Sequence, residues 1–349
     1  MSLFRIGAAF LLAASGVLSP AQQTGELIFP VGSAPFASSH ASTIVALKNG
    51  DLLAAWFGGT DEGAPDVAIW SARHTTGGWS KPVELAREPQ VACWNPVLFH
   101  THDGRLWLYY KIGPSPSNWA GARRFSLDEG LTWSAVERLA AGLLGPIRAK
   151  PLILDDGTIV SGTSFEAWHT WSIWIERSTD NGKTWAKIGP ILPAADARGK
   201  KADEGSTQGL VQPSVVRLGN GHLRLYARST EELARVCVAD SFDDGVTWSS
   251  VHPLDVPNPN SGIDAVALHD GRVVLVYNDA TTGRSPLNLA VSRDGEHFRN
   301  FRTLEDKPGE YSYPAIIQDA AGDLDLTYTW NRKSIKHVHI PLGDVSSQP

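Results

Sequence analysis

Short stretches in which apolar and polar residues alternate recur six times along the chain. They read DLLAAW, RLWLYY, TIVSGT, HLRLYA, RVVLVY and DLDLTY, and each directly follows a glycine that is preceded by Asn, Asp or Ala. The six glycines are Gly50, Gly104, Gly157, Gly221, Gly271 and Gly322. Alternation with a period of two predicts half-buried strands, and a polar residue followed by glycine between apolar runs predicts a hairpin turn. Each repeating unit is therefore expected to begin with a β-hairpin around its glycine.

A second turn motif follows most of these hairpins. Three copies read S-x-D-x-G-x-T-W and span Ser126 to Trp133, Ser178 to Trp185 and Ser241 to Trp248. Two weaker copies span Ser71 to Trp79 and Ser292 to Phe298. In such a turn the aspartate can accept backbone N–H groups, the glycine takes a positive φ, and the tryptophan caps the hairpin from the core side. Its regular recurrence indicates an array of similar units.

Two hairpins in each of six units predict an all-β fold, namely a six-bladed β-propeller with four strands in each blade. The last unit ends at Ser334 to Ile340 without a turn motif of its own. The N-terminal segment Glu26 to Val31 is therefore expected to supply the strand that closes the ring. We expect a single domain over residues 22–349, because one closed ring can contain a chain of that length.

Residues 1–21 have the features of a secretory signal peptide. Arg5 is followed by an apolar stretch from Ile6 to Leu18 and then by Ser19-Pro20-Ala21. This arrangement provides a cleavage site between small residues and is too short to span a bilayer. The sequence therefore predicts a secreted or periplasmic protein with no membrane span. The net charge is −6 and no basic run occurs, so nucleic acid is not an expected partner.

The chain contains two cysteines, Cys93 and Cys237. We expect them to be buried thiols rather than a disulfide, although an oxidising compartment would permit pairing. No CxxC, HExxH or P-loop motif is present. The sequence therefore predicts neither a metal for catalysis nor another cofactor.

The positions at which the six units differ indicate where a site lies. In a radial array the shared positions build the scaffold, whereas the unlike side chains at one rim face a common axis. In four units the first residue of the innermost strand precedes proline, which predicts extended geometry for that residue. The candidates from all six units are His40, Asn95, Lys150, Gln212, Asp264 and Tyr313. These polar groups favour a site for a polar ligand, but they could also line a solvated pore.

Loops at the same end of the units carry further charged candidates. An acidic loop at residues 58–65 contains Asp61 and Glu62. The arginines that lie at or after the second strand of a unit are Arg228, Arg235 and Arg284. Any one of them could be a surface cation. Several that converge with Lys150 would instead bind a carboxylate, because guanidinium groups bind carboxylates bidentately.

Aromatic side chains near this rim could stack against sugar rings, and the candidates are Trp94, Trp119, Trp168 and Tyr110. The aspartates of the turn motifs are expected to have a structural role, because each is occupied by its own backbone and the turns lie on the opposite face. They are Asp128, Asp180 and Asp243.

The motif S-x-D-x-G-x-T-W is the Asp-box, and six units of this kind resemble the sialidase (neuraminidase) superfamily in its BNR-repeat branch over residues 26–340. The resemblance implies a carbohydrate-active glycoside hydrolase of the exo-α-sialidase type. It also implies roles for individual residues. Tyr313 is similar to the catalytic tyrosine nucleophile, and Glu62, with Asp61 beside it, to the acid/base carboxylate. Arg235 and Arg284 resemble the second and third arginines of a triad that binds the substrate carboxylate.

Two positions depart from the pattern of that superfamily. The first arginine of the triad normally begins an Arg-Ile-Pro motif, and here His40-Ala41-Ser42 takes its place. The glutamate that polarises the tyrosine is replaced by Gln212. A neutral amide cannot take a proton from the phenol, and an unaided phenol is a weak nucleophile at neutral pH.

Three functions stay open at this point, and all of them have an acidic glycan or oligosaccharide as the partner. The favoured one is an exo-glycosidase that removes a terminal acidic sugar, sialic acid or a related sugar, with the residues in the roles given above. A polysaccharide lyase could instead act by β-elimination on a uronic-acid glycan such as a rhamnosyl-glucuronide, with His40 and Tyr313 as base and acid. Its carboxylate-binding residues would be Arg235, Gln212 and Asn95. A non-catalytic propeller would bind the glycan without turnover.

Overall fold

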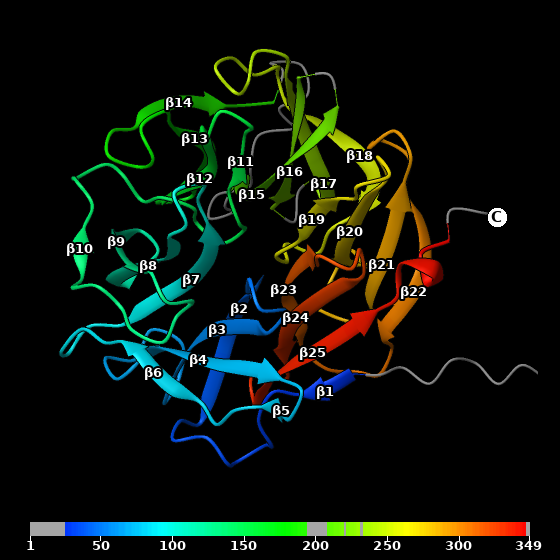
Figure 1. The fold of residues 1–349 in the computed structure, drawn as a ribbon. Coiled ribbons are helices and arrows are strands. Elements are labelled where there is room, and N and C mark those ends of the chain that lie inside the picture. Colours follow the sequence, from blue (N-terminus) through cyan, green and yellow to red (C-terminus); the bar gives the residue numbers. More distant parts are fainter. Residues whose placement is uncertain (1–24, 194–207, 220, 231–232, 347–349) are drawn as a thin grey trace, which may run out of the picture.

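The computed structural model describes residues 25–193, 208–219, 221–230 and 233–346. The expected signal peptide, residues 1–21, lies outside the described residues. The described chain forms six antiparallel blades around a central axis, and each blade contains at least four strands (Figure 1). The prediction of an all-β, six-bladed propeller is confirmed.

The first three blades follow the chain in order. Blade one contains β2 (Ser38–Ala46), β3 (Leu52–Gly59), β4 (Ala68–Thr75), β5 (Gly78–Trp79) and β6 (Val83–Ala86). Blade two contains β7 (Cys93–His100), β8 (Leu106–Ser115), β9 (Asn118–Ser126) and β10 (Glu137–Arg138). Blade three contains β11 (Leu152–Ile153), β12 (Ile159–Ala167), β13 (Thr170–Ser178) and β14 (Ala186–Ile191).

The remaining blades complete the ring. Blade four contains β15 (Gln208–Gly219), β16 (His222–Ser229), β17 (Arg235–Ser241) and β18 (His252–Pro257). Blade five contains β19 (Asp264–Ala267), β20 (Val273–Asn278), β21 (Leu287–Ser292) and β22 (Arg299–Glu305). Blade six contains β23 (Tyr311–Gln318), β24 (Leu324–Trp330), β25 (Ser334–Ile340) and β1 (Gly25–Leu27), and a short 3₁₀ helix, η1 (Leu342–Asp344), follows. Among the described residues, no helix has the length and apolar character needed to cross a membrane.

The six predicted hairpin glycines lie between the first and second strands of their blades. All six have a positive φ, from 74° at Gly221 to 93° at Gly322. This is the region that glycine enters without a steric penalty. The local sequence therefore determines where each blade turns back on itself.

The Asp-box turns join the third strand of a blade to the fourth, and the turn at residues 178–185 is representative. Asp180 accepts hydrogen bonds from the hydroxyl of Ser178 at 2.8 Å and from the N–H and hydroxyl of Thr184 at 2.8 and 2.6 Å. The indole N–H of Trp185 donates to the carbonyl oxygen of Gly182 at 3.1 Å. The hydrogen bonds from Thr184 lower the pKa of Asp180 to about 2. Its carboxylate is occupied within its own turn, as predicted.

The N-terminal strand closes the ring, also as predicted. β1 pairs with β25 and places Glu26 opposite His337, although it is shorter than the expected segment Glu26 to Val31. Beyond the strand, Phe29 stacks on Trp56 of β3 at a centroid distance of 5.2 Å. The hydroxyl of Ser334 donates to the carbonyl oxygen of Phe29 at 2.7 Å. The first described segment therefore joins blade six to blade one.

The innermost strands of blades one, two, four and six are irregular near their first residues. Each pairing with the second strand shifts register there, and the residues with positive φ are Ala41 (55°), Asn95 (41°), Gln212 (56°) and Tyr313 (51°). The expectation that the following proline holds the last three extended is wrong. A β-bulge inserts an extra residue at this point, and it overrides the local preference. Such backbone costs about 1–3 kcal/mol and is concentrated at functional sites.

Cys93 and Cys237 are both buried and are not joined in a disulfide. Burial raises the pKa of each thiol to about 12. The expectation of two buried thiols is confirmed.

Candidate functional site

Tyr313 lies at the centre of the candidate site, on the bulge of β23. Its phenolic oxygen accepts a hydrogen bond from Nη1 of Arg228 at 2.9 Å and another from Nε2 of Gln212 at 3.3 Å. The same Nη1 atom donates to Oε1 of Gln212 at 3.1 Å. Blades four and six therefore meet at this oxygen. Two N–H groups that converge on one oxygen are an arrangement that stabilises a negative charge there.

His40 packs against the ring of Tyr313. The two ring centroids are 4.2 Å apart, and Phe57 contacts the imidazole at 5.5 Å. The side chain is 1% exposed, and neither ring nitrogen has a hydrogen-bond partner among the described residues. Burial holds the pKa of His40 well below its ordinary value, and the charges of surrounding arginines lower it further. The imidazole is therefore neutral at neutral pH.

One carboxylate anchors two further arginines. Glu310, directly before β23, accepts a hydrogen bond from Nη1 of Arg284 at 2.8 Å and from Nε of Arg332 at 2.9 Å. Arg332 comes from the turn between β24 and β25, and its Nη1 atom lies 2.5 Å from Oε2 of Glu62. Burial opposes the charge of Arg332, but the two glutamates outweigh burial and raise its pKa.

The arginines around Tyr313 keep donors for a ligand. Within the described chain, the Nη2 atoms of Arg228, Arg284 and Arg332 donate no hydrogen bond to another residue, because the bonds of these groups use Nη1 and Nε. The guanidinium carbons of Arg228 and Arg284 lie 5.8 and 5.6 Å from the centroid of the Tyr313 ring. This arrangement fits the planar carboxylate of a ligand.

The acidic loop reaches the site through Glu62 rather than Asp61. Glu62 forms the ion pair with Arg332, and its side chain is 35% exposed. Asp61 is exposed, and its Oδ1 atom accepts the backbone N–H of Glu62 at 2.9 Å. The carboxylate of Asp61 therefore stabilises the backbone of the loop, whereas the carboxylate of Glu62 contacts Arg332.

A second carboxyl group borders the site on blade three. Glu166 is half-buried on β12 and lies directly opposite Trp171 of β13. The guanidinium carbon of Arg228 is 5.8 Å from the Trp171 ring. Burial raises the pKa of Glu166, the charge of Arg228 opposes this shift, and the charge of Glu62 adds to it. Glu166 from blade three and Glu62 from the acidic loop of blade one therefore both lie near the arginines around Tyr313.

Lys150 and Asp264 lie further along the channel and pair with each other. Nζ of Lys150 is 3.0 Å from Oδ2 of Asp264. The same carboxylate accepts hydrogen bonds from the hydroxyl of Ser214 at 2.7 Å and from the N–H of Ile316 at 3.0 Å. Ser214 follows Gln212 in blade four, and Ile316 follows Tyr313 in blade six. Because Lys150 comes from blade three and Asp264 from blade five, their ion pair connects blades three to six near the phenol.

A buried arginine adds to these connections. Arg148 is 2% exposed and donates to main-chain carbonyl oxygens of Pro314 and Ile263, which belong to blades six and five. Burial lowers the pKa of this guanidinium. Its carbon lies 5.6 Å from the centroid of the Tyr313 ring, so Arg148 contributes positive charge beneath the site.

The structure does not bring every expected residue to Tyr313. Arg235 has a side chain that is 43% exposed, with its guanidinium 3.8 Å from Asp255. Arg228, seven residues earlier on the neighbouring strand, is the arginine that contacts the phenol. The structure therefore places Arg228, and not the expected Arg235, at the candidate site. Asn95 is buried at the bulge of β7.

The aromatic candidates divide into core and surface residues. Trp94 is 5% exposed, donates to the carbonyl oxygen of Gly113 at 2.7 Å and packs against Trp119, so it supports the acidic loop from below. Tyr110 is buried in the same core. Trp168, at the tip of the β12–β13 hairpin, is 86% exposed.

Four residues of the site were missed in the sequence, namely Arg148, Glu166, Glu310 and Arg332. Glu166 and Arg332 lie at or after the second strand of their blades, as Arg228 and Arg284 do. The same positional rule applied to every unit would have found both. Arg148 and Glu310 lie in connecting loops, where no repeat marks the position.

A family model described as a BNR repeat-like domain matches residues 50–326. No curated protein matches the chain. Similar solved structures include the NanB sialidase of Streptococcus pneumoniae, with a TM-score of 0.73 and 14% identity over 92% of this chain and 71% of that one. The intramolecular trans-sialidase of Ruminococcus gnavus has a TM-score of 0.71 and 14% identity, covering 92% and 98%. A protein of unknown function from Dyadobacter fermentans has a TM-score of 0.74 and 16% identity, covering 92% and 99%. At such identities the similarity shows the fold alone.

Proposed function

The chain belongs to the family of BNR repeat-like domains, and from this premise we propose that it is a secreted glycoside hydrolase that removes a terminal acidic sugar, sialic acid or a related sugar, from a glycan. One observation carries the proposal. The phenolic oxygen of Tyr313 accepts hydrogen bonds from Arg228 and Gln212, beside guanidinium groups whose Nη2 atoms donate to no other residue of the described chain.

The substrate carboxylate would bind to the Nη2 donors of Arg228, Arg284 and Arg332. His40 is neutral, so it cannot supply the charge of the arginine it replaces in the superfamily pattern. Arg332 enters from another strand and carries a charge that Glu310 and Glu62 keep in place. In this proposal the cation missing at His40 is replaced by Arg332.

Tyr313 would act as the nucleophile at the anomeric carbon, a role for which tyrosine is known among glycosidases. The amide of Gln212 cannot accept the phenolic proton. It can donate a hydrogen bond, as Arg228 also does, and two donors stabilise the phenolate and the negative charge that returns to this oxygen when the sugar leaves. In this proposal Arg228 and Gln212 assist Tyr313 by donating hydrogen bonds to its oxygen, and neither acts as a base.

The leaving oxygen needs a proton donor, and two carboxyl groups are available. Glu62 is ion-paired with Arg332, so its carboxylate is already in contact with a guanidinium group. Glu166 has a raised pKa, which favours its acid form. A carboxyl group with a raised pKa is the usual general acid in a glycosidase site. On protonation state, Glu166 is the better candidate for the donor, and Glu62 for holding Arg332.

The burial of His40 speaks against the lyase alternative. A lyase base must reach the proton beside the uronate carboxylate. His40 is 1% exposed, packed between Tyr313 and Phe57, and its ring nitrogens are not available to a substrate.

The test is turnover of a 4-methylumbelliferyl sialoside and of a sialyl-oligosaccharide by the whole protein. We expect hydrolysis, and a loss of kcat of about 100-fold or more in Tyr313→Phe, because the nucleophile is removed. Tyr277→Phe, which removes a phenol bonded to Asn300 in blade five, is the matched control and should keep its activity.

Two results would contradict the proposal. Uronic-acid glycans could yield a product whose new double bond absorbs ultraviolet light, which would establish elimination. The protein could instead bind acidic glycans and turn over none of them, which would establish a binding propeller.

A further inference from the structure

The β12–β13 hairpin of blade three presents an exposed tryptophan at its tip. Ala167 pairs with Thr170, so Trp168 and His169 form the two-residue turn between the strands. Trp168 is 86% exposed, more than any other large hydrophobic side chain of the described chain. The ring of His169 packs edge-on against the indole at a centroid distance of 4.3 Å. Single exposed hydrophobic side chains are common on protein surfaces, so the position of Trp168 decides what it can do.

One face of this hairpin points to the candidate site. The hydroxyl of Ser164 on β12 accepts a hydrogen bond from the backbone N–H of Gln212 at 3.3 Å. Glu166 lies two residues further along β12, and side chains at every second position of a strand share a face. Trp171 pairs with Glu166, and its ring lies 5.8 Å from the guanidinium carbon of Arg228. This face of the hairpin therefore borders the candidate site.

Trp168 continues the order of these residues outward from the site. Ser164 lies beside Gln212, Glu166 follows it, and Trp168 forms the tip. Two residues of strand span about 7 Å, so the backbone of Trp168 lies about that far beyond the backbone of Glu166. The hairpin thus holds a flat apolar side chain one step further from the phenol of Tyr313 than the carboxyl group.

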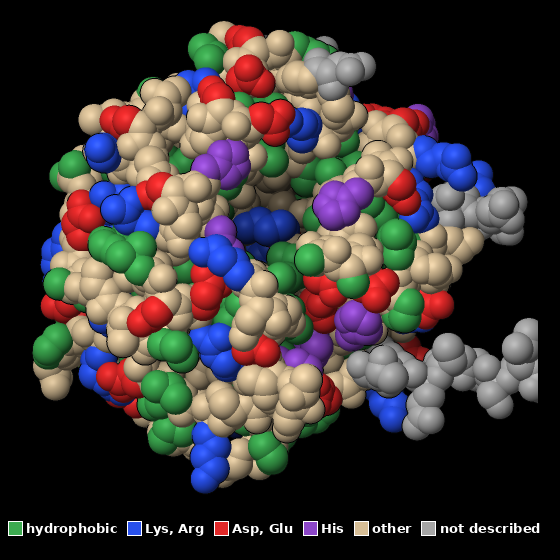
Figure 2. Space-filling model, viewed as in Figure 1, with side chains coloured by type: hydrophobic (Ala, Val, Ile, Leu, Met, Phe, Trp, Pro, Cys, Tyr) green, Lys and Arg blue, Asp and Glu red, His purple; other side chains and the backbone are tan. Residues whose placement is uncertain are grey.

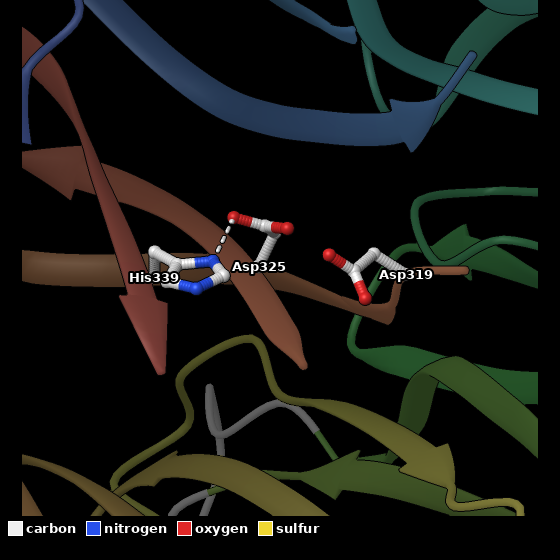
Figure 3. A group of neighbouring side chains, drawn as sticks. All are labelled: Asp319, Asp325 and His339. Atoms are coloured by element: carbon white, nitrogen blue, oxygen red, sulfur yellow. Dashed lines mark hydrogen bonds and ion pairs between the residues drawn. The ribbon is translucent and has the colours of Figure 1, made fainter. Parts of the chain in front are cut away.

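The opposite face of the ring has a different character. Figure 2 shows this face, on which Asp, Glu and His side chains gather around the hollow at the centre of the ring. Asp319, Asp325 and His339 lie at this end of blade six, where Nδ1 of His339 is 3.2 Å from Oδ1 of Asp325 (Figure 3). Carboxylates around an opening disfavour an acidic glycan there. We therefore expect the remainder of the substrate on the side of Trp168.

We propose that Trp168 binds the sugar unit to which the acidic sugar is attached, which is the unit released with the leaving oxygen. This inference rests on the proposed function, in which Glu166 donates a proton to that oxygen. A proton donor must come within hydrogen-bond reach of the oxygen that it protonates, so the released unit would lie beside the β12–β13 hairpin. The C–H groups on one face of its pyranose ring would pack flat on the indole, which the edge contact of His169 holds in place.

This contact defines the class of substrate. Packing on the indole stabilises the bound substrate and the transition state alike, so it lowers KM and leaves kcat unchanged. An acidic sugar linked to a second pyranose should therefore be a better substrate than the same sugar linked to a small alcohol. The structure thus favours oligosaccharides of at least two sugar units.

The experiment compares a sialyl-oligosaccharide with a methyl sialoside, using the full chain. Both substrates release an alcohol that needs a proton, but only the first presents a sugar ring to Trp168. In Trp168→Ala, the kcat/KM for the oligosaccharide divided by the kcat/KM for the methyl sialoside should fall about fivefold or more, mainly through KM. Trp168→Phe keeps an aromatic ring and should recover most of this ratio.

Phe242→Ala is the matched control. Phe242 is a 73% exposed aromatic side chain on an Asp-box turn, where it stacks on His222 at 4.5 Å, and its loss should leave the ratio unchanged. If the unaltered protein hydrolyses both substrates and Trp168→Ala keeps the ratio, the inference is overturned while the proposed function stands. An equal fall of the ratio in Phe242→Ala would also overturn it. If neither substrate is hydrolysed, the proposed function itself fails, and this inference fails with it.

Discussion

At the scale of single residues, the candidate site departs in charge from the pattern that the resemblance led us to expect. Gln212 occupies the place of a glutamate, yet it contacts both Tyr313 and Arg228. His40 occupies the place of an arginine, while Arg332 brings a guanidinium group to the same cluster. Neighbouring groups thus compensate for both differences in charge. The role of each residue is therefore tested by removing the contacts that it makes.

Gln212→Leu should lower kcat by about 10- to 100-fold. The substitution removes a donor to the phenol and an acceptor for a guanidinium, and hydrogen bonds to charged groups contribute about 1.5–3 kcal/mol. Gln318→Leu, at the other end of β23, removes a glutamine bonded to Gly322 and should leave kcat unchanged. Steady-state kinetics with the sialoside measure both. Equal activity of the two variants would contradict the role of Gln212.

The two carboxyl groups should respond differently to the leaving group. Glu166→Gln should be slow on a sialyl-oligosaccharide and much less impaired on the 4-methylumbelliferyl sialoside, whose leaving group hardly needs a proton. Glu62→Gln should impair both substrates similarly, because it loosens Arg332.

The pH profile gives a second measurement of the same assignment. A proton donor works in its acid form, so activity should fall as the pH rises through the raised pKa of Glu166. This alkaline limb should disappear in Glu166→Gln. If it persists there and disappears in Glu62→Gln, the assignment is reversed.

At the scale of elements, the Asp-box turns connect the outer strands. The pKa values of Asp128, Asp180 and Asp243 are each lowered to about 2, chiefly by hydrogen bonds from the threonine of the same turn. Because the unfolded carboxyl group titrates near 4, each turn contributes stability that is present above that pH. This stability is lost as the pH falls from about 4 toward 2.

Asp180→Asn should therefore lower the Tm at pH 7 and reduce the dependence of the Tm on pH between about 4 and 2. Asp306→Asn, in the exposed loop between β22 and β23, serves as the control and should change neither quantity. Thermal melts followed by circular dichroism, at pH 7 and at several pH values between about 4 and 2, measure both quantities. An unchanged acid transition in Asp180→Asn would show that the turn carboxylates do not contribute to stability.

The elements also show how far sequence reasoning extends. The glycine turns and Asp-boxes could be predicted because their hydrogen bonds lie within a few residues. The bulges could not, because the conformation of Gln212 depends on its pairing with β16 as well as on Pro213. For the same reason the sequence could not choose between Arg228 and Arg235, which lie on paired strands and reach different surroundings.

At the scale of the whole molecule, the ring depends on the contact between its first and last strands. Phe29 is 3% exposed, and it packs between Trp56 and Phe36 while its carbonyl oxygen binds Ser334. This side chain and Ile28 are buried in one cluster with Trp56 and Ile335.

Phe29→Ala should lower the free energy of unfolding by about 3–5 kcal/mol, the usual cost of deleting a buried aromatic ring. Leu127→Ala is the control, because Leu127 is 69% exposed on an Asp-box turn; it should change stability by less than about 0.5 kcal/mol. Urea denaturation measures both. Equal midpoints for the two variants would show that blade six and blade one hold together without Phe29.

The pairing of β1 with β25 also affects how the chain matures. β1 is made early and β25 late, so the propeller cannot be completed before nearly all of the polypeptide has been synthesised. Contacts between segments so distant in the chain slow folding. Once β25 has been made, its edge can template aggregation until β1 pairs with it. A polypeptide that is exported before it folds would meet this hazard on the far side of the membrane, where chaperones that shield strand edges would govern its yield.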